Sequence, residues 1–277
     1  MESFRSECHG QVKLGYAQRL GRTELVEQYS CSPFLVQKSF YPTPTTCQTV
    51  ILHTAGGMVG GDRLSQSITL AEQTQALVTT AAAGKIYRTN GLTALQNTQI
   101  HIAPQAHLDW MPQENIVFNE ASYQQNLHIE LELGGSLVLW DITRFGRSAR
   151  GEKFTTGAWR SHTEVWQQGR PLWIDRQYLT GDKNIIASPH GLANQPVIGT
   201  LVWLGLPISK EFMNCLYQQQ PVLDRLGGAS RLAQGLICRY RGDSTAQARN
   251  WFMQVWNLLG EEYLERSNHA PGVWRLG

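Results

Sequence analysis

Short stretches in which apolar and polar residues alternate recur from about residue 30 to residue 205 of this chain. Alternation with a period of two is typical of β-strands that bury one face. Three segments share one layout, in which such a stretch leads through a polar or glycine turn into a second apolar stretch: residues 68–78, 100–108 and 129–139. Residues 163–174 form a looser fourth copy. Each copy is expected to form a β-hairpin.

The copies follow one another at a nearly constant period. Leu70, Ile102 and Leu133 hold the same place in successive copies and lie 32 and 31 residues apart. A fixed period of this length favours stacked β units, none of which can bury its apolar face alone. An ordinary sandwich whose hairpins resemble one another is the alternative, and the pattern leaves both open. Further strands are expected at residues 34–40, 49–54, 197–204 and 232–240.

Apolar residues take up helical spacing late in the chain. Residues 209–226 predict one helix, which Pro221 breaks or kinks near its end. Residues 244–259 predict a second, capped by Ser244 and closed by Gly260. The expected fold is therefore mainly β, a solenoid-like body of stacked hairpins with two helices near the C-terminus. One domain is expected over residues 1–277: a β body at about 30–205, a helix–strand–helix segment at about 206–262 and a C-terminal tail at 263–277.

Composition narrows the function classes. The formal net charge is +2 and no basic block occurs, so the sequence predicts no nucleic-acid partner. No apolar run approaches the roughly 20 residues of a membrane span, and the first residues lack the apolar core of a signal peptide. A cytoplasmic protein without a membrane partner is expected. The five cysteines are odd in number and far apart, which argues against a disulfide framework or a stable metal site.

A dense glycine loop ends in a carboxylate. The stretch 53–62 contains Gly56, Gly57, Gly60 and Gly61, followed directly by Asp62. Such glycines allow positive φ or a close approach of another chain segment. They do not form a phosphate-binding loop, because the required Gly-Lys-Ser/Thr sequence is absent and no helix pattern follows. The expected loop is a tight β turn that fixes the aspartate.

Two further aspartates follow apolar strand segments. Asp141 comes after residues 137–140 and Asp175 after residues 172–174. If the units stack, these acids and Asp62 can converge, and convergent carboxylates can perform acid–base chemistry, bind a hard cation or hold a divalent metal transiently. Surface aspartates at strand ends are the plainer alternative. Glu152, in a second glycine loop, is expected either to pair with Arg147 or to support Asp141.

Taken together, these segments resemble the UreD (also called UreH) family of urease accessory proteins. A glycine loop ending in Gly-Gly-Asp, followed later by Trp-x-Pro-Gln-Glu, is a specific combination. The resemblance departs at Gly84, where Ser or Thr often precedes the lysine, and at Asp175, where glutamate also occurs. The matching segments, in chain order, are residues 39–42, 53–62, 85–88, 110–114, 140–141, 146–147 with 151–152, 175–176 and 199–201.

This resemblance implies a non-enzymatic scaffold for nickel insertion. Members dock on apo-urease and recruit a helical, UreF-like accessory protein, which recruits a UreG-like GTPase that carries nickel. An internal polar tunnel is the nickel route proposed in the family. Asp62, Asp141 and Asp175 correspond to its acidic positions, and Lys85 and Glu152 lie in neighbouring motifs. No tightly bound cofactor is implied, and nickel would be held only transiently, as weak oxygen ligands favour.

Two other functions remain open at this stage. A β-solenoid carbohydrate-active enzyme could use two of the three aspartates beside an open groove lined by Trp110, Trp140 and Trp173. A plain binding module would have no continuous polar interior. For partner binding, the two late helices and the tail at 269–277 are the candidates, with Trp251, Trp256 and Trp274 as the aromatic contacts.

Overall fold

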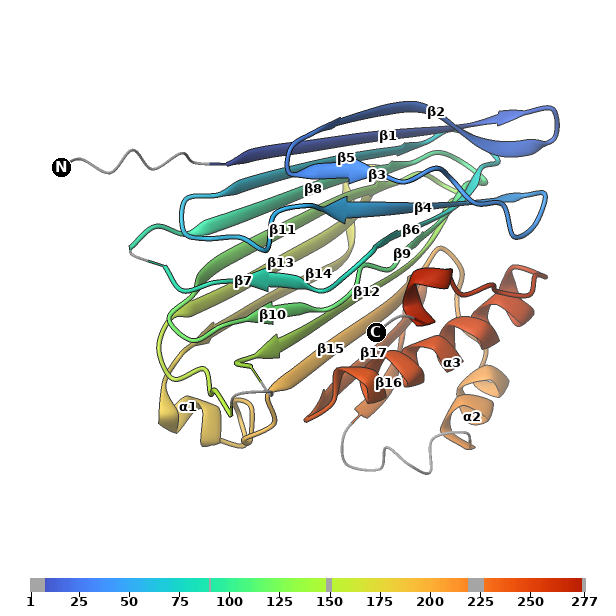
Figure 1. Cartoon of the computed structure of the whole chain (residues 1–277). Helices are drawn as coiled ribbons and strands as arrows, with labels where there is room; N and C mark the ends of the chain where they lie inside the picture. The colour runs from blue at the N-terminus through green and yellow to red at the C-terminus, as the bar shows by residue number, and fades with distance from the viewer. Residues whose placement is uncertain (1–7, 90, 148–150, 219–226, 276–277) are drawn as a thin grey trace.

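Two β-sheets lie face to face in the computed structural model, and helices cover one of them (Figure 1). The structure describes residues 8–89, 91–147, 151–218 and 227–275. The seven-stranded sheet has the order β14-β13-β11-β8-β5-β1-β2. Its strands are β1 (His9–Arg19), β2 (Arg22–Cys31), β5 (Arg63–Leu70), β8 (Ala94–Ile102), β11 (Ser122–Leu131), β13 (Ala158–Gln167) and β14 (Arg170–Thr180).

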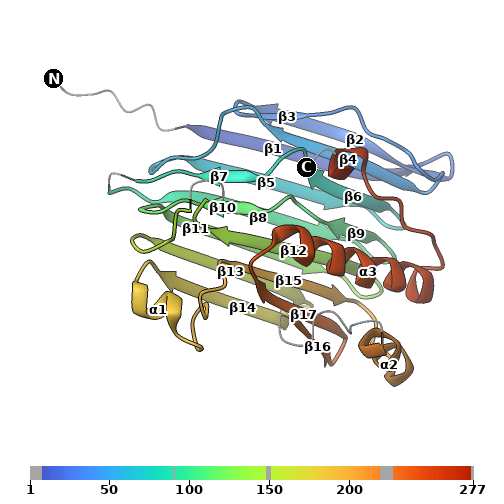
Figure 2. The same ribbon diagram turned by 60° about the horizontal axis from the view of Figure 1, so that its bottom comes forward.

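The ten-stranded sheet has the main order β16-β17-β15-β12-β9-β6-β4-β3, and two short strands, β7 and β10, join it beside β12. Figure 2 shows this sheet lying between the other sheet and helix α3. Its strands are β3 (Phe34–Val36), β4 (Thr46–His53), β6 (Gln75–Thr80), β7 (Gly84–Ile86), β9 (His107–Trp110), β10 (Asn115–Val117), β12 (Ser136–Phe145), β15 (Val197–Leu204), β16 (Gly227–Leu232) and β17 (Gly235–Gly242).

The predicted stacking of units is confirmed, but the strands within a unit do not pair with each other. Ile68 of β5 pairs with Ile100 of β8, and Ile100 pairs with Ile129 of β11, in parallel register. The second strand of each unit, β6, β9 or β12, stacks in the same way in the other sheet. The turn of each unit therefore crosses between sheets instead of closing a hairpin. The period-two pattern is the same in both arrangements, so it could not separate them.

Three other details differ from the sequence prediction. Leu133 is not the partner of Ile102, because β11 ends at Leu131, which takes that place, and Leu133 lies exposed in the turn. The fourth unit, β13–β14, is a true antiparallel hairpin. The β body begins at β1 rather than near residue 30, and the hairpin β1–β2 extends the seven-stranded sheet.

The late segment contains a hairpin between two helices instead of a single strand. Helix α2 spans Lys210–Gln218, the antiparallel pair β16–β17 follows, and α3 spans Thr245–Tyr263. The last eight residues of the predicted helix 209–226 lie outside the described residues. Ser244 caps α3 as predicted, its hydroxyl accepting from the Gln247 amide. Gly260 does not close α3, since it lies inside the helix, where the absent side chain makes room for Asn268.

Two hydrophobic cores share the ten-stranded sheet. One lies between the sheets and includes Ile68, Ile100 and Ile129. The other lies between the opposite face of the ten-stranded sheet and α2, α3 and the C-terminal segment. The described residues also contain helix α1 (Lys183–Ala187) and the 3₁₀ helix Gly272–Arg275. Among the helices in the described ranges, none combines the length and apolarity needed to cross a bilayer.

Candidate functional site

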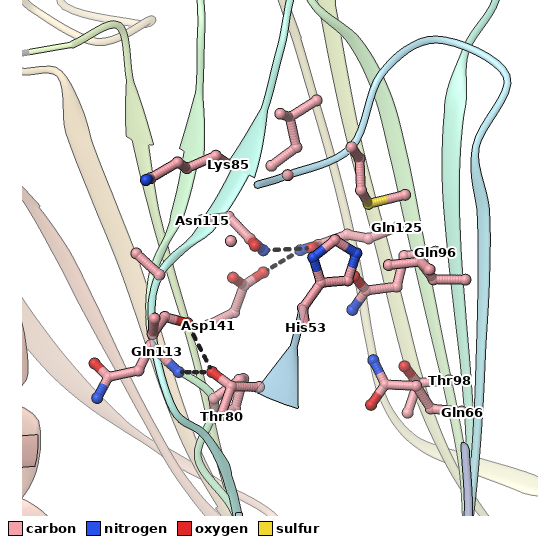
Figure 3. A pocket seen from close by; sticks show the side chains of 18 of the residues that line it. His53, Gln66, Thr80, Lys85, Gln96, Thr98, Gln113, Asn115, Gln125 and Asp141 are labelled. Carbon is pink, nitrogen blue, oxygen red and sulfur yellow. Dashed lines mark hydrogen bonds between the residues drawn. The ribbon is translucent and has the colours of Figure 1, made fainter. Parts of the chain in front are cut away.

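A cavity of about 260 Å³ opens between the two sheets beside the glycine loop. Its wall draws on both sheets, and Figure 3 shows amide, hydroxyl, imidazole and carboxyl side chains pointing into it. Apolar residues of the sandwich core form the remainder of the wall. The polar residues that line the cavity are His53, Gln66, Thr80, Lys85, Gln96, Thr98, Gln113, Asn115, Gln125, Asn126, Asp141 and Thr163.

The polar wall of the seven-stranded sheet arises because successive strands place polar residues at matching interior positions. Gln96 of β8 pairs in register with Gln125 of β11, which pairs with Ser161 of β13, which pairs with Gln177 of β14. Apolar residues occupy the interior positions toward both ends of these strands. A polar row therefore runs across the strands through the middle of an otherwise apolar core, and polar interior groups need partners to be tolerated.

Asp141 lies on this row from the opposite sheet. It projects from β12, where the Gln125 amide donates to its Oδ2 and the Ser161 and Thr143 hydroxyls lie 3.5 Å from its carboxylate oxygens. The pKa of Asp141 is raised to about 6; burial is the largest cause and the nearby Asp175 adds to it, whereas the neutral donors oppose the shift. A carboxylate solvated by neutral donors retains an uncompensated charge when ionised. Asp141 is thus suited to receive a cation.

Asp175 reaches the same interior region from β14, as the sequence predicted for these two aspartates. Unlike Asp141, it is fully engaged by a cation. Arg239 of β17 forms a two-pronged ion pair with it, at 2.7 Å and 2.9 Å, and Gln177 donates to it at 2.6 Å. The same guanidinium donates to the Thr200 hydroxyl at 2.6 Å. The ion pair therefore joins the two sheets across the interior.

Two basic groups lie near the mouth of the cavity. The His53 ring points into the cavity (Figure 3), and its Nδ1 lies 3.0 Å from the Ala55 carbonyl oxygen. Because a carbonyl can only accept, Nδ1 carries the proton and Nε2 keeps its lone pair. Burial lowers the pKa of His53, so the ring is neutral at pH 7. Lys85 of β7 lies on the cavity wall with its side chain exposed.

The glycine loop packs against β7. The Met58 amide donates to the Lys85 carbonyl at 2.8 Å, and a side chain at Gly57 would overlap that carbonyl. A side chain at Gly60 would likewise overlap Thr89. The predicted need for close approach is thus met, since the loop forms part of the wall beside the cavity mouth.

Asp62 and Glu152 do not reach the cavity. Asp62 is buried and accepts the Val59 amide at 2.8 Å and the Cys8 amide at 3.3 Å, so it ties the glycine loop to the first strand. Glu152 pairs with Arg147 at 2.6 Å and accepts the Asn119 amide at 2.8 Å. Of the two roles open to Glu152, the structure supports pairing with Arg147. Neither acid lies on the polar row.

The three tryptophans expected at partner surfaces are core residues instead. Trp251, Trp256 and Trp274 are 3%, 2% and 7% exposed. The C-terminal segment folds back so that the Trp274 ring packs against Trp140 at a tilt of 36°, with centroids 5.0 Å apart, and its indole N–H donates to the Thr79 hydroxyl at 2.9 Å. Aromatic side chains are large enough to gain more from this burial than from solvation at a terminus.

Two other expectations concern metals and sugars. Within the described part of the chain, no group of three or more His, Cys, Asp and Glu residues is arranged to hold a metal ion. The groove lined by tryptophans that a carbohydrate-active enzyme would need is not formed by Trp110 and Trp140, because both rings are buried. Trp173 is partly buried and packs against the core between the sheets.

Several residues of the site stand in no sequence motif that marks them as functional. Gln125, Ser161, Thr200 and Arg239 belong to common residue types in unremarkable strands, and His53 stands in no ligand motif. The sequence does mark the polar row in one way: a polar residue stands at the centre of an otherwise apolar alternation, and this recurs from unit to unit. It required the correct register, which the pattern of period two did not supply.

The fold and site define a β protein with a polar interior between two sheets, in which one carboxylate lacks a cationic partner. Over residues 8–275 the chain matches the family model described as UreD urease accessory protein. Urease accessory protein UreD of Nostoc punctiforme is 55% identical over 271 residues, which cover 97% of this chain and 96% of the relative. The proteins of that name from Acaryochloris marina and a Synechocystis strain are 49% and 42% identical, covering 99% and 86% of this chain and 98% and 90% of the relatives. The chain belongs to the UreD urease accessory protein family.

Proposed function

We propose that this chain is a non-catalytic scaffold in urease maturation in the cytoplasm. It docks on apo-urease and connects it to a UreF-like helical protein and a UreG-like GTPase, so that nickel is inserted into urease. Family membership supports the role in urease maturation. The docking, the bridging and the nickel transfer are the proposed part.

The polar row between the sheets is the proposed nickel path. It combines a neutral imidazole at the mouth, His53, with side-chain amides and hydroxyls along the wall and one unpaired carboxylate, Asp141. Oxygen ligands and a single imidazole hold a borderline divalent ion weakly, which allows the ion to move on. Thiolates or several histidines in one cluster would hold the ion too tightly for transfer.

The environment of Asp141 is the observation that carries this proposal. A carboxylate in an apolar core is costly unless it is paired or neutralised. Here it is surrounded by neutral donors, and burial raises its pKa to about 6. This is the arrangement expected if the missing positive charge is supplied by a transient cargo.

Asp141→Asn tests the path. The variant keeps the shape and the hydrogen-bond acceptor but removes the charge. In a reconstitution with apo-urease, the accessory partners and nickel, the nickel content of urease should fall about fivefold, as expected for the loss of roughly 1 kcal/mol of charge attraction. Nickel is measured by mass spectrometry, and complex formation by co-purification.

Asp243→Asn is the matched control, because Asp243 is an exposed aspartate at the end of β17. It should leave the nickel content unchanged. Normal nickel loading by the Asp141 variant in an intact complex would contradict the proposed path. Failure of the wild-type chain to co-purify with apo-urease and the accessory partners would contradict the scaffold role itself.

A further inference from the structure

At the end of the cavity away from the glycine loop, the lining stops one strand before the ion pair between Asp175 and Arg239. This end is called the inner end. Asp141 of β12 and Thr163 of β13 line the cavity on the strands that neighbour β15 and β14. In the ten-stranded sheet Asp141 pairs in register with Thr200, and Thr200 pairs with Arg239. In the seven-stranded sheet Thr163 pairs in register with Asp175. On both sheets the next strand therefore carries a side chain that Arg239 binds: Thr200 in the ten-stranded sheet and Asp175 in the seven-stranded sheet.

This ion pair lies at an open side of the sandwich. Asp175 is on β14, the edge strand of the seven-stranded sheet, and Arg239 is on β17, next to the edge strand β16. The Asp175 side chain is 16% exposed and the Arg239 side chain 42% exposed. Gly228 faces Arg239 in register, and a Cβ added there would meet no atom of the described residues within 4 Å. The partly exposed guanidinium therefore lies between the polar row and solvent.

The guanidinium also occupies a cation position. It is bound by both oxygens of Asp175 and by the Thr200 hydroxyl. Carboxylate and hydroxyl oxygens also suit a divalent metal ion. A divalent ion arriving from Asp141 would meet the same oxygens and would repel the guanidinium. Because the Arg239 side chain is 42% exposed, water can solvate the guanidinium once it leaves the carboxylate.

We propose that Arg239 is the gate at the inner end of the polar row, a built-in cation that competes with the cargo ion for Asp175 and Thr200. This inference rests on the proposed nickel path and adds its regulation. With Arg239 in place the cavity ends blindly beside Asp141. When a divalent ion replaces the guanidinium at Asp175, the side chain moves toward the open side, and the row becomes a passage through the sandwich.

Nickel binding by the isolated full-length chain tests the competition. Arg239→Gln should raise the affinity for Ni²⁺, measured by equilibrium dialysis, on the order of tenfold or more, because a fixed positive charge within a few ångströms is removed. Arg239→Lys retains the charge without the two-pronged geometry and should show a smaller rise. Arg231→Gln, an exposed arginine on the neighbouring edge strand β16, is the matched control and should change nothing.

Adding Asp175→Asn to Arg239→Gln should abolish the gain in affinity. An unchanged affinity in Arg239→Gln, or a gain that persists without the Asp175 charge, would overturn the gate. Thermal unfolding of each variant identifies any that fails to fold, and Arg239→Lys then provides the test. The path and the gate fail separately: a nickel-loading defect in Asp141→Asn with unchanged binding in Arg239→Gln rejects the gate alone.

Discussion

The two faces of the ten-stranded sheet each hold an inward-facing aspartate, and its partners differ between the two faces. Asp109 on β9 lies under α3 and the C-terminal segment, fully buried. It forms an ion pair with Arg266 and accepts from the Trp256 indole at 2.9 Å. Asp141 on β12 lies on the interior face and is held by neutral groups. Asp109 thus has a permanent cationic partner in the protein, whereas Asp141 has none among the residues that hold it.

The pKa values follow this difference. Burial raises the pKa of both carboxyl groups. At Asp109, Arg266 and His107 outweigh burial and lower the pKa to about 2, whereas at Asp141 burial prevails and the pKa is about 6. A buried carboxylate with a permanent partner is part of the structure, and one without a partner is a candidate for function. One sheet therefore carries two kinds of site. The first is a structural ion pair between Asp109 and Arg266, here called the clamp, and the second is the candidate functional site around Asp141.

Removing the cation of the clamp should have the largest effect on stability. Arg266→Met leaves Asp109 buried and without its ion-pair partner, which should lower the free energy of unfolding by about 3 to 5 kcal/mol. Chemical denaturation measures this loss. Arg22→Met is the control, since Arg22 forms an exposed ion pair with Glu24 and should change little. A small loss for Arg266→Met would remove the distinction between clamp and site.

The covered face can also be tested without a charge. Trp274→Ala should lower the free energy of unfolding by about 3 kcal/mol, because it empties a ring-sized space among Trp140, Trp256 and Thr79. The same denaturation experiment measures it. Full stability together with weaker partner binding would instead restore Trp274 as a contact residue.

At Asp141, removing a charge should raise the free energy of unfolding instead of lowering it. A pKa raised in the folded state favours folding at low pH, and this contribution is lost as the pH rises from about 4 to about 6. Asp141→Asn should therefore be more stable than the wild type at pH 7, by about 1 to 2 kcal/mol. Denaturation at pH 7 and at pH 4 measures the difference, which should shrink at the lower pH. A pH-independent difference would show that the charge is not the cause.

Asp109 should give the opposite pH dependence. Its lowered pKa contributes stability above about pH 4, and that stability is lost as the pH falls toward about 2. Acid unfolding curves of the wild type and of Asp109→Asn should differ at pH 6 and converge near pH 2. Equal separation at both pH values would show that the clamp does not depend on the ionised carboxylate.

The smallest effect is expected on the outer face of the seven-stranded sheet. There His128 lies between Glu130 and Glu164, at 2.9 Å and 3.1 Å, and all three are partly exposed. Burial alone would lower the pKa of His128, but the two glutamates raise it. Glu164→Gln should cost less than about 1 kcal/mol. The cost should be present near pH 6 and fade at higher pH as His128 loses its proton, which denaturation at both values checks.

The sequence allowed the strand content, the stacking period and the α3 cap to be predicted. It did not reveal that the first three units divide their strands between two sheets, because alternation marks a buried face but not the partner strand. The β1–β2 hairpin was missed. The second helix was placed correctly at its start and too short at its end, because Gly260, normally a stop signal, is needed for contact with Asn268.

Within the site, the convergence of Asp141 and Asp175 followed from the stacking. Asp62 and Glu152 were assigned to the path through the resemblance, Asp62 by its motif position and Glu152 because it lies in a neighbouring motif. Their carboxylates are satisfied by nearby amides and by Arg147, contacts that depend on local backbone geometry. Arg239 could not be found, since its partner Asp175 lies 64 residues away on the other sheet.

Division of the first three units between two sheets has a consequence for how such a body can change in length. Each of these units adds one strand to both sheets at once, so duplicating one of them would lengthen the interior row by one strand spacing, about 4.8 Å, with every turn preserved. Inserting one residue within a strand would instead rotate that strand's side chains to the other face. Growth by whole modules is therefore tolerated, whereas small insertions within strands would break the row.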